Sequence, residues 1–153
     1  MSEENKALVH RWIKEVWNEG RDQTIDELFD PDSIAEGLGE TDQEVRGPQA
    51  FREFYRNMRS LLPDLHLHVE DTLAEGDKVV IRVRLEGTHT GSGMGTRGTG
   101  HLVKVRGVVI LQITGGRIVH GWNAWDQLGF LRQIGAAATR PAPTVDRFFE
   151  HGR

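Results

Sequence analysis

The spacing of apolar residues divides the chain into a helical first part and a strand-rich second part. Residues 3–19 carry a broad apolar stripe at helical spacing, formed by Leu8, Val9, Trp12, Ile13, Val16 and Trp17. A shorter helix follows around residues 25–29 and ends at Pro31. Gly47-Pro48 opens a third helix with proline in its first turn, and Pro63 closes it. The pattern therefore predicts three helices before any strand.

From residue 65 the apolar period changes to two, which predicts β-strands. Apolar and polar residues alternate in four runs, at residues 65–70, 79–86, 101–113 and 118–125. The TGGR sequence at residues 114–117 is a hairpin signal between the last two runs. A final helix begins near Asp126 and ends at Gly135. Three helices, an antiparallel meander and a last helix indicate an α+β fold, in which a strongly curved sheet would leave a cavity at its open end.

Length and composition exclude several classes of function. The 153 residues suit one domain, predicted over residues 1–135, with a C-terminal extension at 136–153. A net charge of −4 without a basic stripe argues against nucleic-acid binding. No run reaches the roughly 18–20 apolar residues of a membrane span, and the charged N-terminus is unlike a signal peptide, so we expect a cytoplasmic protein. The absence of cysteine excludes disulfides and thiol catalysis.

Several polar side chains share the predicted inner face of the sheet. If the hairpin turn centres on residues 115–116, His120 lies opposite Leu111. In the same register Trp122 lies opposite Val109. Cross-strand partners share a face, and the odd-numbered residues of the preceding strand are apolar. The pattern therefore predicts five inward side chains: His89, His101, His120, Trp122 and Asp126.

The position of Asp126 supports two interpretations. A buried carboxylate has a raised pKa, which moves it towards the range of a useful general base. Alternatively, Asp126 is the N-cap of the last helix and accepts a hydrogen bond from the backbone N–H of Gly129 or nearby. The two roles are compatible. His120 is likewise open to a catalytic role or to that of a hydrogen-bonded structural histidine.

Other motifs point to packing rather than chemistry. Residues 93–98 match the G-x-G-x-x-G dinucleotide pattern, but a strand follows instead of a helix, so we interpret them as a flexible lip over the cavity. His66 and His68 share one face of a strand, as some metal ligands do. That face is the outward one, so we expect no metal site. Trp12 and Phe54 fit either the helical core or a pocket wall.

Three segments together resemble the SnoaL-like polyketide cyclases, also called ester cyclases. They are NKALVHRWIKEVWNEG with DELF after it, GPQAFREFYRNMRSLLPDLHLHVEDTLAEGDKVVIRVRLEGTHTG, and GRIVHGWNAWDQLGFLRQIG. The resemblance covers roughly residues 5–135. It implies the fold of the nuclear transport factor 2 superfamily, a cone-shaped curved antiparallel sheet (an α+β barrel) closed by the N-terminal helices and commonly found as a dimer.

The resemblance also implies a chemistry. Cyclases of this family close a ring by intramolecular aldol condensation on an aromatic polyketide ester, without metal or cofactor. One aspartate, near the junction of the last strand and the final helix, removes a proton next to a carbonyl, and Asp126 best matches that position. His120 and Gln112 would then be the nearby polar groups that hold the enolate or orient the substrate.

The main functional prediction is therefore a cofactor-free lyase or isomerase-like enzyme that acts on a small apolar carbonyl compound. Besides catalytic Asp126 and His120, the residues expected around the substrate are Trp12, Glu36, Phe54, His89, Met94, His101, Gln112 and Trp122. Two alternatives stay open. One is an epoxide-opening hydrolase of the same fold, with Glu36 as a second acid. The other is a non-catalytic protein whose cavity binds a small hydrophobic ligand, with Asp126 only a helix cap.

Overall fold

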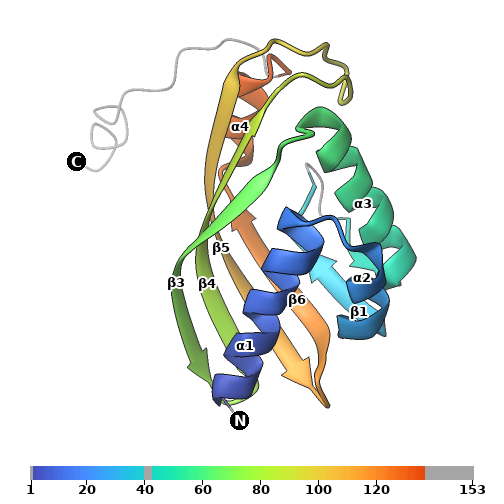
Figure 1. Cartoon of the computed structure of the whole chain (residues 1–153), viewed down its shortest axis with the longest axis vertical. Coiled ribbons are helices and arrows are strands. Elements are labelled where there is room, and N and C mark those ends of the chain that lie inside the picture. Colours follow the sequence, from blue (N-terminus) through green and yellow to red (C-terminus); the bar gives the residue numbers. More distant parts are fainter. Residues whose placement is uncertain (1, 40–42, 137–153) are drawn as a thin grey trace, which may run out of the picture.

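The computed structural model describes residues 2–39 and 43–136 as a curved six-stranded sheet with helices against one face (Figure 1). The helices are α1 (Ser2–Trp12), the π-helix η1 (Ile13–Asn18), α2 (Asp22–Leu28), α3 (Gly47–Leu61) and α4 (Gln127–Gln133). The strands are β1 (Phe29–Glu36), β2 (Val45–Arg46), β3 (His66–Glu75), β4 (Lys78–Thr88), β5 (Leu102–Thr114) and β6 (Arg117–Trp125). Most of the predicted C-terminal extension, residues 137–153, lies outside the described residues.

The sheet has the strand order β2-β1-β6-β5-β4-β3. β3 to β6 form the predicted antiparallel meander, but β1 runs parallel to β6. The sheet is therefore antiparallel except between β6 and β1, a strand that the sequence pattern did not predict. Its sequence, FDPDSIAE, contains a proline and three acidic residues, and pairing with β6 outweighs this unfavourable local composition. In the described part of the chain β2 and β3 are not paired with each other, so the sheet is open rather than a closed barrel.

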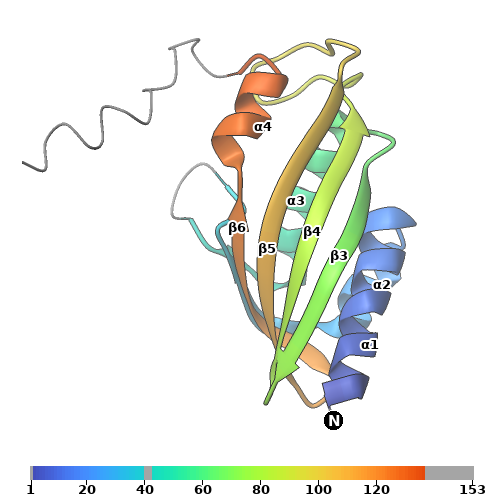
Figure 2. The ribbon, with the colours of Figure 1, turned by 90° about the vertical axis from the view of Figure 1, so that its left-hand side faces the viewer.

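The core lies between the helices and the odd-numbered side chains of the central strands. On β4 and β5 these buried residues are Val79, Ile81, Val83, Leu85, Val103, Val105, Val109, Leu111 and Ile113. Trp12, Phe29 and Phe51 pack against one another above them, with ring centroids 5.0–5.7 Å apart. Figure 2 shows the other face of the sheet, where no described helix covers β4 or β5. The fold therefore has one apolar, covered face and one uncovered face.

The predicted first helix is helical throughout, but its second half is the π-helix η1. The wider turns of π-helices are frequently found at functional sites. Asn18 ends η1 and bonds both backbone groups of Leu67 on β3, at 2.7 Å and 3.0 Å. From the other side, Arg59 of α3 donates to the carbonyl of Trp17 (2.7 Å). These contacts fix η1 between the sheet and α3, where Trp17 is buried at the centre of the fold.

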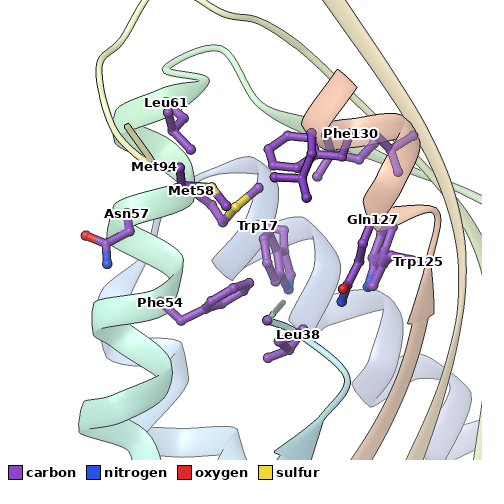
Figure 3. Close-up of a pocket in the computed structure, with 14 residues that line it drawn as sticks. Trp17, Leu38, Phe54, Asn57, Met58, Leu61, Met94, Trp125, Gln127 and Phe130 are labelled. Atoms are coloured by element: carbon purple, nitrogen blue, oxygen red, sulfur yellow. The ribbon is translucent and has the colours of Figure 1, made fainter. Parts of the chain in front are cut away.

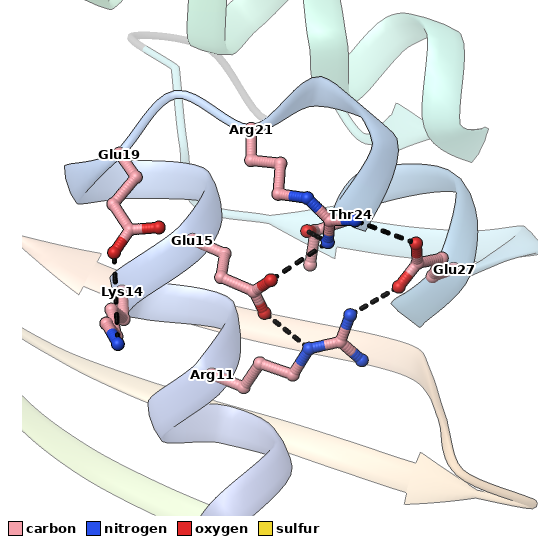
Figure 4. Close-up of polar contacts among 7 residues, drawn as sticks. All are labelled: Arg11, Lys14, Glu15, Glu19, Arg21, Thr24 and Glu27. Carbon is pink, nitrogen blue, oxygen red and sulfur yellow. Dashed lines mark hydrogen bonds and ion pairs between the residues drawn. The ribbon is translucent and has the colours of Figure 1, made fainter.

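A network of charged side chains joins α1 and η1 to α2 (Figure 4). Arg11 bonds both Glu15 and Glu27, and Arg21 donates to Glu15 (2.9 Å) and to the hydroxyl of Thr24 (2.8 Å). Desolvation alone would raise the pKa of Glu15, but the hydrogen bonds and charges of the two arginines outweigh it and lower that pKa. The network orients the helices that carry one wall of the cavity described below.

Candidate functional site

A β-bulge in β6 decides which of its side chains face the helices. Ile113 pairs with Ile118 as predicted, but His120 pairs with Gln112, so Val119 is an extra residue. The predicted pairs Leu111–His120 and Val109–Trp122 are wrong, because the bulge shifts the register by one. His120 and Trp122 consequently lie on the outer face of the sheet, and the residues in their predicted places on the inner face are Gly121, Asn123 and Trp125.

An apolar cavity of about 270 Å³ lies between α3, α4 and the inner face of the sheet (Figure 3). Its lining residues are Trp17, Leu38, Gly39, Phe54, Asn57, Met58, Leu61, Leu85, Met94, Val105, Trp125, Gln127, Phe130 and Leu131. In Figure 3 the side chains of Phe54 and Met58 on α3 face Phe130 on α4 across this space. A cavity of this size and lining suits a small, largely apolar molecule.

The polar groups at the cavity are few. Among its described lining residues, none is Asp, Glu, His, Lys or Arg, and Asn57 and Gln127 supply the side-chain amides. Figure 3 shows the amide of Asn57 directed away from the centre. The Nε2 of Gln127 donates to the carbonyl of Gly37 (3.1 Å), which holds the segment carrying Leu38 against α4. Gln127 is therefore the polar side chain best placed to meet a ligand.

A smaller apolar cavity of about 30 Å³ lies deeper in the fold. It shares Trp17, Leu38 and Trp125 with the larger one, so these three side chains separate the two spaces. Trp12, predicted as core or pocket wall, is buried here rather than at the larger cavity. Asn123 also lines this deeper space; its Nδ2 donates to the backbone carbonyl of Glu36 (2.9 Å).

Asp126 occupies the N-cap of α4, and its Oδ1 accepts a hydrogen bond from the backbone N–H of Gly129 (2.9 Å). The helix-cap interpretation is therefore confirmed. The prediction that the side chain points inward among the apolar residues is wrong, because Asp126 is exposed. Its chain neighbours Trp125 and Gln127 both line the larger cavity, which Asp126 itself does not line.

Four predicted site residues gather on the outer face of the sheet instead of at the cavity. His120 donates through Nε2 to Glu36 and stacks on Trp122 with ring centroids 4.1 Å apart. Gln112 donates to Asp77 (2.7 Å) on the same face. The bulge explains this displacement for His120 and Trp122. With Glu36 held there, the second inward acid that an epoxide-opening hydrolase needs is not at the cavity.

The remaining predicted residues occupy different positions around the lip. Phe54 and Met94 line the cavity. His101 is exposed ahead of β5. His89 is fully buried, but it bonds threonines of the lip and does not line the cavity. His66 and His68 lie edge to face on β3, and no group of three or more His, Asp or Glu residues within the described ranges could hold a metal ion.

Sequence reasoning missed Gln127, Phe130 and Leu131 as lining residues. Their spacing of three and four along the final helix was a usable signal, because such residues share one helix face. Asn123 and Trp125 carried no comparable signal, since only the bulge at Val119 turns them inward.

The chain matches the family model of the SnoaL-like polyketide cyclases over residues 7–134, and it therefore belongs to that family. It is 28% identical to the aklanonic acid methyl ester cyclase DnrD of Streptomyces peucetius, over 91% of this chain and 93% of DnrD. Membership of this family agrees with an apolar cavity built for a small molecule. No helix among the described residues is long and apolar enough to cross a membrane.

Comparison with solved structures identifies the same fold in other proteins. A protein from Jannaschia sp. CCS1, assigned to the SnoaL-like polyketide cyclases, superposes with a TM-score of 0.80 at 25% identity, covering 90% of this chain and 95% of that one. AclR of Streptomyces galilaeus, assigned as a hydroxylase, gives a TM-score of 0.79 at 27% identity, covering 93% and 91%. The fold is that of the nuclear transport factor 2-like proteins.

Proposed function

We propose that this chain is a cofactor-independent cyclase that binds an apolar, polyketide-like ester and closes a ring by an intramolecular aldol reaction. Family membership supports the reaction class, and the compound in the name of DnrD, aklanonic acid methyl ester, indicates the substrate class. The observation that carries the proposal is the apolar cavity lined by Trp125 and Gln127, the residues immediately before and after Asp126 in the sequence.

In this proposal the apolar rings of the substrate fill the cavity and its reacting carbonyl lies at the rim. Asp126 takes a proton from the carbon next to that carbonyl. The enolate carbon attacks a second carbonyl carbon of the same molecule, one carbon–carbon bond forms, and the resulting alkoxide takes the proton back from Asp126. The atoms and electrons balance without an added reactant.

Gln127 is the proposed partner of the enolate oxygen. Its Nε2 uses one hydrogen in the bond to Gly37, and a primary amide has a second hydrogen to donate. A donor held in place before the reaction stabilises developing negative charge without reorganisation. His120 and Gln112 have no part in this step, because both lie on the outer face of the sheet, His120 through the bulge in β6 and Gln112 as an even-numbered residue of β5.

Asp126→Asn tests the base. Asparagine is as good an N-cap as aspartate, so we expect little change in the melting temperature. We expect the turnover of aklanonic acid methyl ester to fall about 100-fold or more, as for loss of a general base. His120→Gln on the outer face is the matched control and should retain turnover. Equal turnover by the wild type and Asp126→Asn would exclude Asp126 as the base.

A second candidate function is a non-catalytic binding protein. It is favoured by one observation: none of the described lining residues carries an ionisable side chain. In that case calorimetry would show the ester binding equally to the wild type and to Asp126→Asn, and neither protein would form product. Asp126 would then serve α4 as a cap alone.

We also propose that the chain forms a homodimer through the uncovered face of the sheet. Leu102 and Val108 are exposed apolar residues of β5, and Val108 belongs to this face. Light scattering after gel filtration should give twice the monomer mass for the wild type. Val108→Lys should give the monomer mass, and an unchanged dimer would exclude this face as the interface.

A further inference from the structure

The lip between β4 and β5 has an unusual turn at its tip. Gly93 and Thr96 exchange two backbone hydrogen bonds (3.1 Å and 2.9 Å), which closes a two-residue turn over Met94 and Gly95. Both central residues have positive φ, 50° and 73°. Such turns usually carry Asn-Gly, because larger side chains are disfavoured at positive φ. Met94 is thus held in a conformation that it would not adopt without support.

His89 supplies that support from beneath the turn. It is fully buried, and its Nε2 lies 3.2 Å from the hydroxyl of Thr96. That hydroxyl donates its hydrogen to the carbonyl of Gly93 (2.8 Å), so it accepts from His89 and Nε2 carries the proton. On the other side of the ring, Nδ1 accepts from the backbone N–H of Thr99 (3.4 Å) and lies 3.1 Å from its hydroxyl. The ring therefore ties Thr96, at the end of the turn, to Thr99 in the segment that follows.

The lip is also fastened to the helix that forms the cavity wall. The N–H of Gly91 donates to the carbonyl of Leu61 at the end of α3 (3.1 Å). A Cβ on Gly91 would lie 1.6 Å from the carbonyl oxygen of Ser60, so only glycine allows this approach. In Figure 3 Met94 lies beside Met58 of α3, and both line the cavity. The tip of the lip is therefore held at the mouth.

We propose that His89 is a positioning residue that holds Met94 over the mouth of the cavity and so sets the rate at which an apolar ligand enters and leaves. His89 acts through Thr96 and does not touch the ligand. The inference deepens the proposed function, since the gated space is the proposed substrate cavity. The inference can be tested without the catalytic step, because the rate at which a non-reacting ligand enters and leaves the cavity measures the gating directly.

The test uses the apolar dye 1-anilinonaphthalene-8-sulfonate and stopped-flow fluorescence to measure its dissociation rate. Leu85→Trp, which fills the cavity, identifies the signal that comes from this site. Thr96→Val keeps the shape of the side chain but removes the hydroxyl that His89 bonds. We expect it to raise the dissociation rate about three- to tenfold, because it removes the hydrogen bonds of that hydroxyl to both His89 and Gly93. Thr96→Ser should restore the wild-type rate, and Thr90→Val on exposed Thr90 is the matched control.

A double substitution separates gating from general destabilisation. Asparagine tolerates positive φ, so Met94→Asn keeps the turn but removes the apolar gate and should also raise the dissociation rate. If Thr96 acts by holding Met94, adding Thr96→Val to Met94→Asn should cause no further increase. Additive effects, or a Thr96→Val protein with a lower melting temperature and an unchanged dissociation rate, would overturn the proposal. So would failure of the dye to bind the wild type and every variant.

Discussion

The two faces of β6 differ in what surrounds their side chains. Gly121, Asn123 and Trp125 face the helices and help enclose apolar space. One residue away along the strand, His120 and Trp122 stack on the uncovered face, where His120 bonds Glu36. The histidine–carboxylate pair that most resembles catalytic chemistry is therefore remote from the cavity. The comparison shows that the face of the sheet on which a side chain lies, rather than its residue type, decides whether it can contribute to the cavity.

The largest test of this difference places the same charge on each face of β6. Ile118 is fully buried on the inner face, so Ile118→Asp would bury a carboxylate among apolar side chains, and we expect loss of cooperative urea unfolding. Ala124 is exposed on the outer face, and Ala124→Asp should still unfold cooperatively, as the wild type does. Cooperative unfolding of both variants would show that the side of the sheet does not decide how a residue is packed.

Much of the fold follows from the sequence because local periodicity reports burial. The helices over 3–19 and from Gly47, and the four strands of the meander, all lie where the apolar pattern predicts them. β1 could not be predicted in this way, since its stability comes from parallel pairing with residues of β6 that are 86 or more positions distant in the sequence. Pairing between distant segments leaves no local pattern.

The site was less predictable than the fold for a related reason. Phe54 and Met94 at the cavity and the cap at Asp126 can be inferred from helical spacing, glycine content and helix-start chemistry. The positions of His120 and Trp122 depend on one unpaired residue in a strand. The alternation of apolar and polar residues does not reveal such a bulge. Likewise, η1 has the same apolar stripe as an α-helix, so its wider turns are not visible in the sequence.

A second test compares the packing of the inner face of β5 with that of its outer face. Gly107 of β5 lets the indole of Trp125 lie against the strand, and a Cβ there would come within 2.5 Å of the ring. We expect Gly107→Val to lower the free energy of unfolding by about 1–3 kcal/mol through overpacking and to weaken dye binding, because Trp125 lines the cavity. Thr114→Ala, at the exposed end of the same strand, should change the free energy of unfolding by about 0.5 kcal/mol or less. Similar losses for both would mean that the two faces are packed alike.

The smallest expected effect belongs to the outer side of the sheet, where polar contacts depend on pH. The backbone N–H of Thr88 donates to Asp64 (2.6 Å) and its hydroxyl donates to the same carboxylate (2.8 Å). Both bonds favour the ionised form, so the pKa of Asp64 is lowered in the folded chain. A lowered folded-state pKa stabilises the fold above the ordinary carboxyl pKa of about 3.9, and that contribution is lost as the pH falls through the folded-state pKa.

Asp64→Asn should therefore be less stable than the wild type at pH 7, and the difference should shrink as the pH falls below about 4. Urea unfolding between pH 7 and pH 3 measures this, with Asp32→Asn on exposed Asp32 as the matched control. A difference between the wild type and Asp64→Asn that stays constant down to pH 3 would mean that Asp64 contributes through shape rather than charge. Because dye binding depends on the inner face, we expect this substitution to leave the dissociation rate of the dye unchanged, which separates the outer contacts from the cavity.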